Sequence, residues 1–283
     1  AFKKSYSNCR TYIFYLEQGK SFFQQAQTAP ENIQPILIFY GLTFILKATL
    51  LTIDPDYPAT TAVLAHGVST RKRKKQNYDY FQDEVKIQKY GLFPYFSRIL
   101  FQIRGLEGEK YTIRSLLMQI PELHHLFHKW EKEMISLPVK RNNDIFVISH
   151  EILDCFNMTA ERFRDYLQQK TGQVLTVIST HQYLQITFPN WKNNKPAEMF
   201  PFRLNIKDHT YYLTKERSPL SFLPEILIHY LLLYHLSMLA RYEIEKWSEL
   251  IQDKEGFEYP IIRYYLQISS GKCLYLLSDY LSE

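Results

Sequence analysis

The sequence predicts an α+β fold that is mostly α, and three observations support this prediction. Long apolar segments with helical spacing occupy the N-terminal half and the C-terminal quarter of the chain. The middle segment, residues 139–217, changes to the two-residue alternation and β-branched side chains of strands. Hydrophobic residues make up 46% of the 283 residues and charged residues 22%, a balance that excludes a disordered chain.

We expect three parts along the chain. Residues 1–138 form an N-terminal helical part, residues 139–217 a small mixed α/β segment, and residues 218–283 a pair of C-terminal helices. Because a helix that is apolar on all sides has to be buried, we expect the C-terminal helices to pack back on the N-terminal part.

The first two elements are predicted to be helices. Residues 5–27 carry apolar residues at helical spacing, and residues 36–53 form an apolar run that Asp54 and Pro55 end. This run has 18 residues and contains Lys47, so it is short for a membrane span. We therefore expect a buried helix of a soluble protein and no membrane partner.

Three polar residues of this second helix share one face. Tyr40, Thr43 and Lys47 follow the spacing i, i+3, i+7, which places them on one stripe. The stripe fits a seam at the solvent boundary, with the Lys47 ammonium reaching outward. The alternative is a polar lining that faces another helix or a ligand.

The next segment is predicted to contain a short helix and then a basic loop. Residues 59–69 read as a helix that ends near His66 and Gly67. The run from Arg71 through Lys72, Arg73 and Lys74 to Lys75 supplies five positive charges, and the net charge of the whole chain is +5. The remainder of the chain is therefore neutral, and the basic character is local. Together with neighbouring tyrosines, the run has the composition of a nucleic-acid contact, and it also fits an exposed basic loop.

Residues 109–137 are predicted to be helical, with a new turn beginning at Pro121. His124 and His128 stand four residues apart, a spacing that can place two imidazoles on one metal ion. Such a site needs a third ligand, and no HExxH motif is present. We predict no metal site.

The middle segment combines strands with one helix. Residues 144–152 alternate like a strand, and two later stretches, 174–188 and 200–214, each read as a pair of strands. Between them Thr159 is a candidate N-cap for a short helix that runs to Lys170.

The longest helical pattern runs from Pro224 to about residue 253. Its first two-thirds are apolar on nearly every face, and a final third is amphipathic. His229, His235 and Arg241 lie along it, which favours a core helix over a membrane span. An arginine beside an apolar run usually has a partner, so Arg241 indicates either a structural pair with Glu245 or a site for an anion. A last helix follows at residues 257–280.

No sequence motif fixes a chemistry. Neither GxxxxGK[ST] nor GxGxxG occurs, so no phosphate-binding glycine loop and no cofactor are predicted. Cys9, Cys155 and Cys273 are far apart and odd in number, which favours a reducing compartment, and we expect the cytoplasm. We lean towards a protein that is not an enzyme.

Two stretches resemble a known family. HYLLLYHLSMLARYEIEKW (229–247) and FYGLTFILKATLL (39–51), the latter followed by His66 and Gly67, are similar to the bacterial YaaC-like protein family. More loosely they resemble the helical HEPN-like class. The family resemblance implies a cytoplasmic bacterial protein without established catalytic residues. Some members of the family are encoded beside an enzyme of guanine-nucleotide synthesis, which implies a metabolic partner.

The HEPN-like resemblance implies a ribonuclease only where a helix carries an Arg-x(4–6)-His motif. The formal match in this chain is Arg203-x5-His209, which lies in a segment predicted as strands. Arg241 is on a suitable helix, but Lys246, Trp247 and Ser248 stand where the histidine belongs. The motif therefore argues against RNA cleavage.

Three hypotheses for function follow. The first is a non-catalytic regulatory protein that binds a protein partner, with an enzyme of nucleotide metabolism as the candidate. The second is a nucleic-acid-binding or RNA-cleaving protein that uses the basic run 71–75. The third is a binding protein for a small anion or a nucleotide, with five candidate ligand-binding residues: Tyr40, Lys47, His66, His229 and Arg241.

Overall fold

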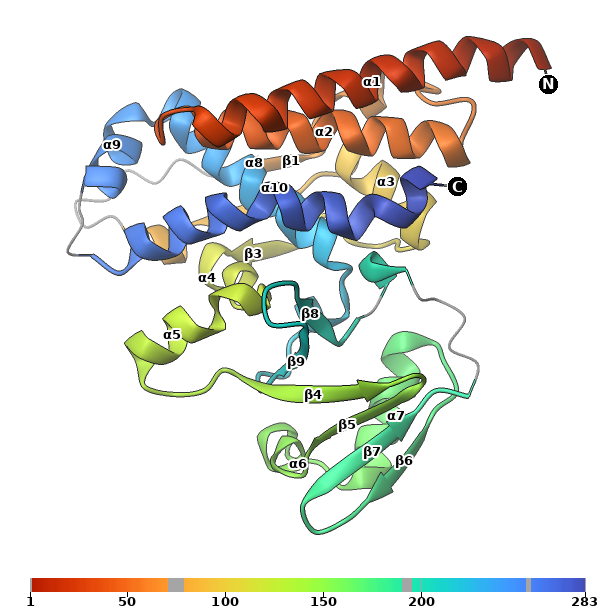
Figure 1. The fold of residues 1–283 in the computed structure, drawn as a ribbon, viewed down its shortest axis with the longest axis vertical. Coiled ribbons are helices and arrows are strands. Elements are labelled where there is room, and N and C mark those ends of the chain that lie inside the picture. Colours follow the sequence, from red (N-terminus) through yellow and green to blue (C-terminus); the bar gives the residue numbers. More distant parts are fainter. Residues whose placement is uncertain (1, 71–78, 190–194, 199, 253–255, 283) are drawn as a thin grey trace. The chain divides into compact units, whose positions relative to one another are not determined.

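The computed structural model describes residues 2–70, 79–189, 195–198, 200–252 and 256–282. The chain divides into two compact units. The first unit comprises Ala1–Leu116 and Ile226–Glu283, and the second comprises Leu117–Glu225. Helices dominate and the strands form two antiparallel sheets, which confirms the predicted α+β, mostly α class (Figure 1).

Helices form most of the first unit. The helices α1 (Phe2–Thr28), α2 (Gln34–Ile53) and α10 (Glu258–Ser282) run side by side in Figure 1, and α2 packs against both of the others. This unit also contains α3 (Leu92–Phe101), α8 (Glu225–Tyr242) and α9 (Ile244–Gln252), together with most of the short helix α4 (Ile113–Leu117). A three-stranded sheet has the order β1 (Val68–Thr70), β2 (Glu84–Ile87) and β3 (Lys110–Thr112).

Helix α2 is the only described helix whose length and composition would allow it to cross a membrane. In the structure 61% of its most apolar window is buried inside the protein. Phe39, Leu42 and Leu46 are fully buried, as expected for the core helix of a globular unit.

The long C-terminal pattern forms two helices rather than the single helix predicted. Helix α8 ends at Tyr242 and α9 begins at Ile244, where the sequence changes from mostly apolar to amphipathic. Trp247 of α9 is 1% exposed, and its indole N–H donates to the carbonyl of Asn32 at 3.1 Å. Burial of this one large side chain fixes the direction of α9, because indole needs both an apolar pocket and an acceptor.

Two further segments differ from the prediction. Residues 59–69 form a 3-10 helix (η1, Thr61–Leu64) followed by strand β1, where one short helix was expected. Residues 109–137 are not one long helix but β3, α4 (Ile113–Leu117), a 3-10 turn η3 (Pro121–Leu123) and α5 (His124–Glu131). Pro121 cannot donate a helical hydrogen bond, so the helix breaks before it.

A six-stranded sheet forms the second unit. The strand order is β6-β7-β5-β4-β9-β8, and every neighbouring pair is antiparallel. The strands are β4 (Ser136–Asn142), β5 (Ile145–Ser149), β6 (Thr176–Ser179), β7 (Tyr183–Thr187), β8 (Arg203–Asn205) and β9 (Thr210–Thr214). Two helices, α6 (Glu151–Phe156) and α7 (Ala160–Thr171), supply Phe156, Phe163 and Leu167 to the core of this unit.

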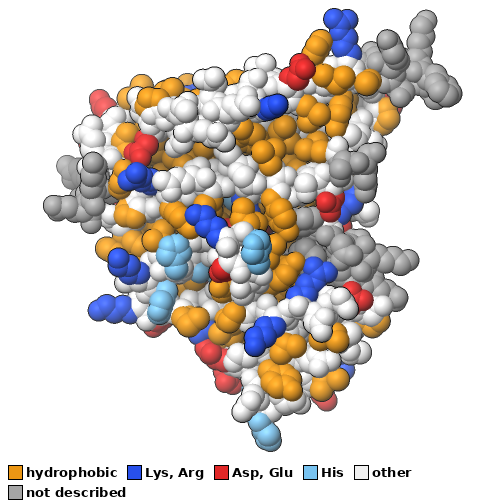
Figure 2. Space-filling view, in the orientation of Figure 1, with side chains coloured by type: hydrophobic (Ala, Val, Ile, Leu, Met, Phe, Trp, Pro, Cys, Tyr) orange, Lys and Arg blue, Asp and Glu red, His pale blue; other side chains and the backbone are white. Residues whose placement is uncertain are grey.

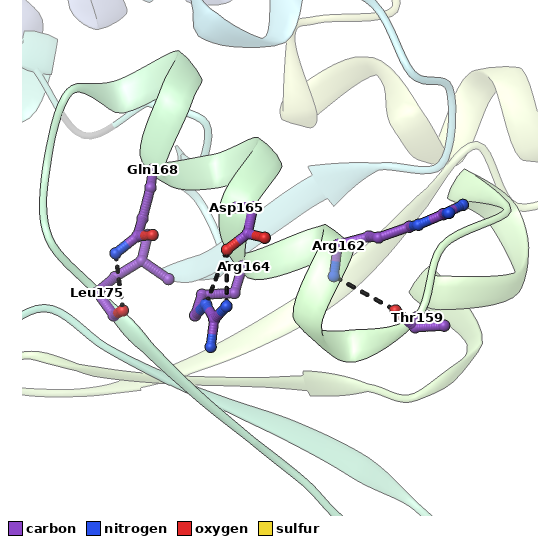
Figure 3. Close-up of polar contacts among 6 residues, drawn as sticks. All are labelled: Thr159, Arg162, Arg164, Asp165, Gln168 and Leu175. Atoms are coloured by element: carbon purple, nitrogen blue, oxygen red, sulfur yellow. Dashed lines mark hydrogen bonds and ion pairs between the residues drawn. The ribbon is translucent and has the colours of Figure 1, made fainter.

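Helix α7 begins where the sequence predicts. The hydroxyl of Thr159 accepts from the backbone N–H of Arg162 at 3.3 Å, which satisfies one of the free donors at the helix start (Figure 3). Near the other end, the Gln168 amide donates to the carbonyl of Leu175 at 3.3 Å and ties the helix to the chain that enters β6.

Candidate functional site

Four of the five predicted ligand-binding residues come together in the first unit. Tyr40 and Lys47 lie on α2, His66 follows η1, and Arg241 lies in the last turn of α8. All four side chains are half-buried. We call these four residues the α2–α8 cluster.

The guanidinium of Arg241 is held by neutral groups. Its Nη1 donates to the Tyr40 hydroxyl at 2.9 Å, and its Nε donates to the carbonyl of Ser237 at 3.1 Å. Nη2 reaches the hydroxyl of Ser237 at 3.3 Å. The guanidinium also lies 5.5 Å above the centre of the Tyr40 ring. An arginine has five N–H donors, so these contacts orient it and still leave donor capacity for a ligand.

The His66 imidazole is enclosed by aromatic rings. Ring centres of Phe39, Tyr234 and Tyr40 lie 5.0, 5.6 and 6.3 Å from it. Its own backbone is fixed, because the His66 carbonyl accepts from the Phe93 N–H at 3.1 Å and from the Tyr230 hydroxyl at 3.0 Å. The side chain is therefore positioned before any ligand arrives.

The pKa of His66 is lowered from 6.5 to about 4. Burial is the largest cause, and the positive charges of Arg241 and then Lys47 supply the rest. The imidazole is consequently neutral at physiological pH and offers one donor and one acceptor. The charges of Arg241 and Lys47 both act on this imidazole.

Lys47 lies among aromatic rings. Its ammonium is 5.4 Å from the ring centre of Phe44 and 5.8 Å from that of Tyr15. Burial lowers the pKa of its ammonium. The stripe that the sequence predicts along α2 thus faces Tyr15 of α1 at Lys47 and Arg241 of α8 at Tyr40. This arrangement matches a lining more closely than a solvent seam.

No carboxylate forms an ion pair with Lys47 or Arg241 within the described part of the chain. The pairing of Arg241 with Glu245 that the sequence allows is not formed. Two cations, partly withdrawn from water and close enough to shift the same histidine, create a positive potential that favours an anion. On the face drawn in Figure 2, by contrast, Lys and Arg side chains lie scattered among apolar and neutral groups.

His229, the fifth predicted residue, contacts a different part of the first unit. It is fully buried, its Nδ1 lies 3.0 Å from the hydroxyl of Tyr265, and the two rings stack with centres 5.6 Å apart. This pair joins α8 to α10. We therefore assign His229 a structural role and remove it from the candidate site.

A buried polar pair, His235 and Asp83, is not evident from the sequence. His235 Nε2 lies 3.1 Å from Asp83 Oδ2, and the two residues are 2% and 7% exposed. They are 152 positions apart in the sequence. A small cavity of about 90 Å³ adjoins the pair. No spacing rule relates an acid before β2 to a histidine on α8, so no signal in one sequence could identify it.

The other predicted sites have different outcomes. The basic run 71–75 lies outside the described residues, so the nucleic-acid hypothesis built on it remains a prediction. Both ring nitrogens of His124 are engaged, with the carbonyl of Met118 at 3.0 Å and the hydroxyl of Ser136 at 2.6 Å, whereas His128 is exposed. Among the described residues no three His, Cys, Asp or Glu side chains are grouped to hold a metal ion.

The formal ribonuclease motif is split between core and surface. Arg203 is 4% exposed and donates from Nη2 to the carbonyls of Leu220 at 2.8 Å and Leu223 at 2.9 Å. His209 sits in the exposed turn between β8 and β9 with a φ of 56°. The arginine fixes the chain that leaves β9 in the second unit, and the pair forms no shared site.

Comparison with known proteins gives one result. No curated protein and no solved structure matches the chain. The family described as YaaC-like Protein matches residues 1–281, which is nearly the whole sequence. The match includes every residue of the α2–α8 cluster. The chain belongs to the YaaC-like family.

Proposed function

We propose that this protein is a non-catalytic regulatory protein that binds a small anionic metabolite at the α2–α8 cluster. The observation that carries the proposal is the environment of His66, whose pKa is lowered to about 4 partly by Arg241 and Lys47. Both cations stand in a half-buried aromatic setting, and neither has a carboxylate partner within the described residues. An anion bound there would supply the missing negative charge.

The chemistry of the cluster favours a phosphate group. Arginine presents a planar fork that pairs with phosphate or carboxylate oxygens, and a nearby ammonium adds a point charge. The Tyr40 hydroxyl and the neutral His66 imidazole add polar partners of modest strength. The aromatic rings around them suit a ligand that carries a ring as well as a phosphate, such as a nucleotide.

The regulatory part of the proposal rests on the family resemblance. An enzyme of nucleotide metabolism is the protein partner that the resemblance implies, and it remains a prediction. A nucleotide that such an enzyme makes or consumes has the phosphate and the aromatic base that the cluster suits.

Isothermal titration calorimetry tests the anion site directly. Pyrophosphate, guanosine monophosphate and adenosine diphosphate are titrated into the native protein and into Arg241→Gln and Lys47→Met. Loss of one charge-assisted contact removes about 1.5–3 kcal/mol, so each variant should bind the best of these ligands roughly tenfold to a hundredfold more weakly.

Two substitutions outside the cluster serve as controls. Arg162 of α7 points away from its neighbours in Figure 3, where only its backbone N–H is bonded, and Lys20 of α1 is exposed. Arg162→Gln and Lys20→Met change the net charge by the same amount and should bind as the native protein does. Equal affinity in all five proteins, or no binding of any of the three ligands, would contradict the proposed function.

A further inference from the structure

A second cleft lies in the first unit, outside the α2–α8 cluster. It has a volume of about 460 Å³, and its lining comes entirely from the continuous stretch 59–107. Three segments contribute lining residues: the segment around η1, the segment from Lys89 into α3, and the loop 103–107 after α3. This volume is in the range of pockets that hold small organic ligands.

The lining combines apolar walls with positive charge. Apolar side chains come from each of the three segments: Val63 before β1, Pro94 on α3, and Leu106 in the loop. Three basic residues and one acid also line the cleft: Lys89, Arg98, Arg104 and Glu107. The lining therefore has an excess of two positive charges. In the sequence as a whole, basic and acidic residues balance once the run 71–75 is left out.

The basic side chains of the cleft are available to a ligand. The described residues provide no ion pair to Lys89, Arg98 or Arg104. Arg98 lies 5.3 Å above the centre of the Tyr95 ring, a cation–π contact that orients the guanidinium without neutralising it.

Contacts behind the cleft hold the Tyr95 ring in place. The Tyr95 hydroxyl donates to the carboxylate of Asp54, which caps the C-terminal end of α2. The ring also packs against Tyr57, with centres 5.7 Å apart. The platform under Arg98 is therefore built into the junction of α2 and α3, and it is set before a ligand binds.

We propose that this cleft binds a small organic anion. Its phosphate or carboxylate pairs with Arg98 and Arg104, and its apolar or aromatic body lies against Val63, Pro94 and Leu106. This site is separate from the α2–α8 cluster, because the two share no residue. The inference does not depend on the proposed function.

Phenyl phosphate, benzoate and the neutral analogue benzyl alcohol are the probes. Each is titrated by calorimetry into the native protein and into Arg241→Gln, whose cleft is intact. We expect phenyl phosphate or benzoate to bind both proteins at least about tenfold more tightly than benzyl alcohol. The better of the two anions identifies whether a phosphate or a carboxylate is the preferred group.

Two variants locate the binding. The double variant Arg98→Gln with Arg104→Gln removes the charge and should weaken the better anion by at least about tenfold. Ala62→Trp leaves every charge in place and fills the cleft from the η1 segment, so it should also weaken binding. Arg162→Gln with Lys20→Met is the matched control for lost charge and should leave the affinity unchanged.

Two results would overturn the proposal. One is that both anions bind the native protein no better than benzyl alcohol. The other is that the double variant and Ala62→Trp both keep the native affinity for the better anion. Failure of the proposed function would look different. In that case Arg241→Gln would bind nucleotides as the native protein does, while the cleft would still bind the better anion.

Discussion

Arg241 on α8 donates a hydrogen bond to the hydroxyl of Tyr40 on α2 at 2.9 Å, although the two residues are 201 positions apart in the sequence. The contact joins the two stretches that carry the family resemblance. It also places a cation beside a neutral oxygen in a half-buried setting, where a carboxylate would be the usual partner.

Tyr40→Phe should destabilise the first unit modestly. The substitution keeps the ring under the guanidinium and removes the acceptor of one hydrogen bond, which contributes about 1 kcal/mol. We expect the melting temperature to fall by roughly 2–4 °C in differential scanning calorimetry. The control is Phe44→Leu. It alters aromatic packing beside Lys47, on the next turn of α2, and leaves the hydrogen bond between Tyr40 and Arg241 in place. An unchanged melting temperature in Tyr40→Phe would mean that the hydrogen bond contributes nothing to stability.

His66 should make stability depend on pH in a defined window. Its pKa is about 4 in the folded protein and 6.5 in its ordinary state, so the unfolded chain binds more protons between these values. The folded state therefore loses stability as the pH falls from about 6.5 to about 4. His66→Gln cannot be protonated, and its unfolding free energy should vary less over the same range. Parallel pH profiles of the two proteins in urea denaturation would refute the assignment.

Arg241→Gln should raise the pKa of His66 without restoring it to 6.5. Burial is the largest cause of the shift, and the charge of Arg241 is the second. The change is measured as the titration midpoint of the imidazole by NMR. Lys47→Met should act in the same direction by a smaller amount, because its effect on His66 ranks third.

The buried pair of His235 and Asp83 should contribute strongly to stability. Asp83→Ala leaves His235 Nε2 without its bonded carboxylate, and such a loss removes about 1–3 kcal/mol. Asp83→Asn keeps an oxygen acceptor and should be milder. Urea denaturation of both variants measures the difference, and equal stability of Asp83→Ala and the native protein would contradict the structural role of the pair.

Gly91 and Gly271 should respond in opposite directions to alanine. Gly91 has a φ of 128°, and an added Cβ would lie 2.3 Å from the Cα of Gly67, so Gly91→Ala should remove roughly 1–3 kcal/mol of stability. Gly271 lies within α10 with open space around it, and Gly271→Ala should add about 0.5–1 kcal/mol. Thermal unfolding checks both variants. A lower melting temperature is expected for Gly91→Ala, where two backbones lie close together, and a higher one for Gly271→Ala, where only helix propensity changes.

The class of the fold and most of its helices could be predicted because apolar periodicity depends on local sequence. The break at Glu243 could not, since it depends on burying Trp247 against a carbonyl of Asn32, which is 215 positions away. Tyr40, Lys47, His66 and Arg241 were predicted because polar residues stand out within apolar helices. The same reasoning selected His229, which the structure places against Tyr265 and apart from the other four, because a buried histidine bonded to a tyrosine looks identical in sequence to a ligand-binding one.

The titration of His66 in the presence of pyrophosphate tests the central claim most directly. Saturating pyrophosphate should raise the NMR midpoint of His66 above about 4 in the native protein, because the bound anion offsets the charges of Arg241 and Lys47. In Arg241→Gln the same addition should leave the midpoint nearly unchanged. A midpoint in the native protein that does not move when pyrophosphate is added would contradict an anion site at the α2–α8 cluster.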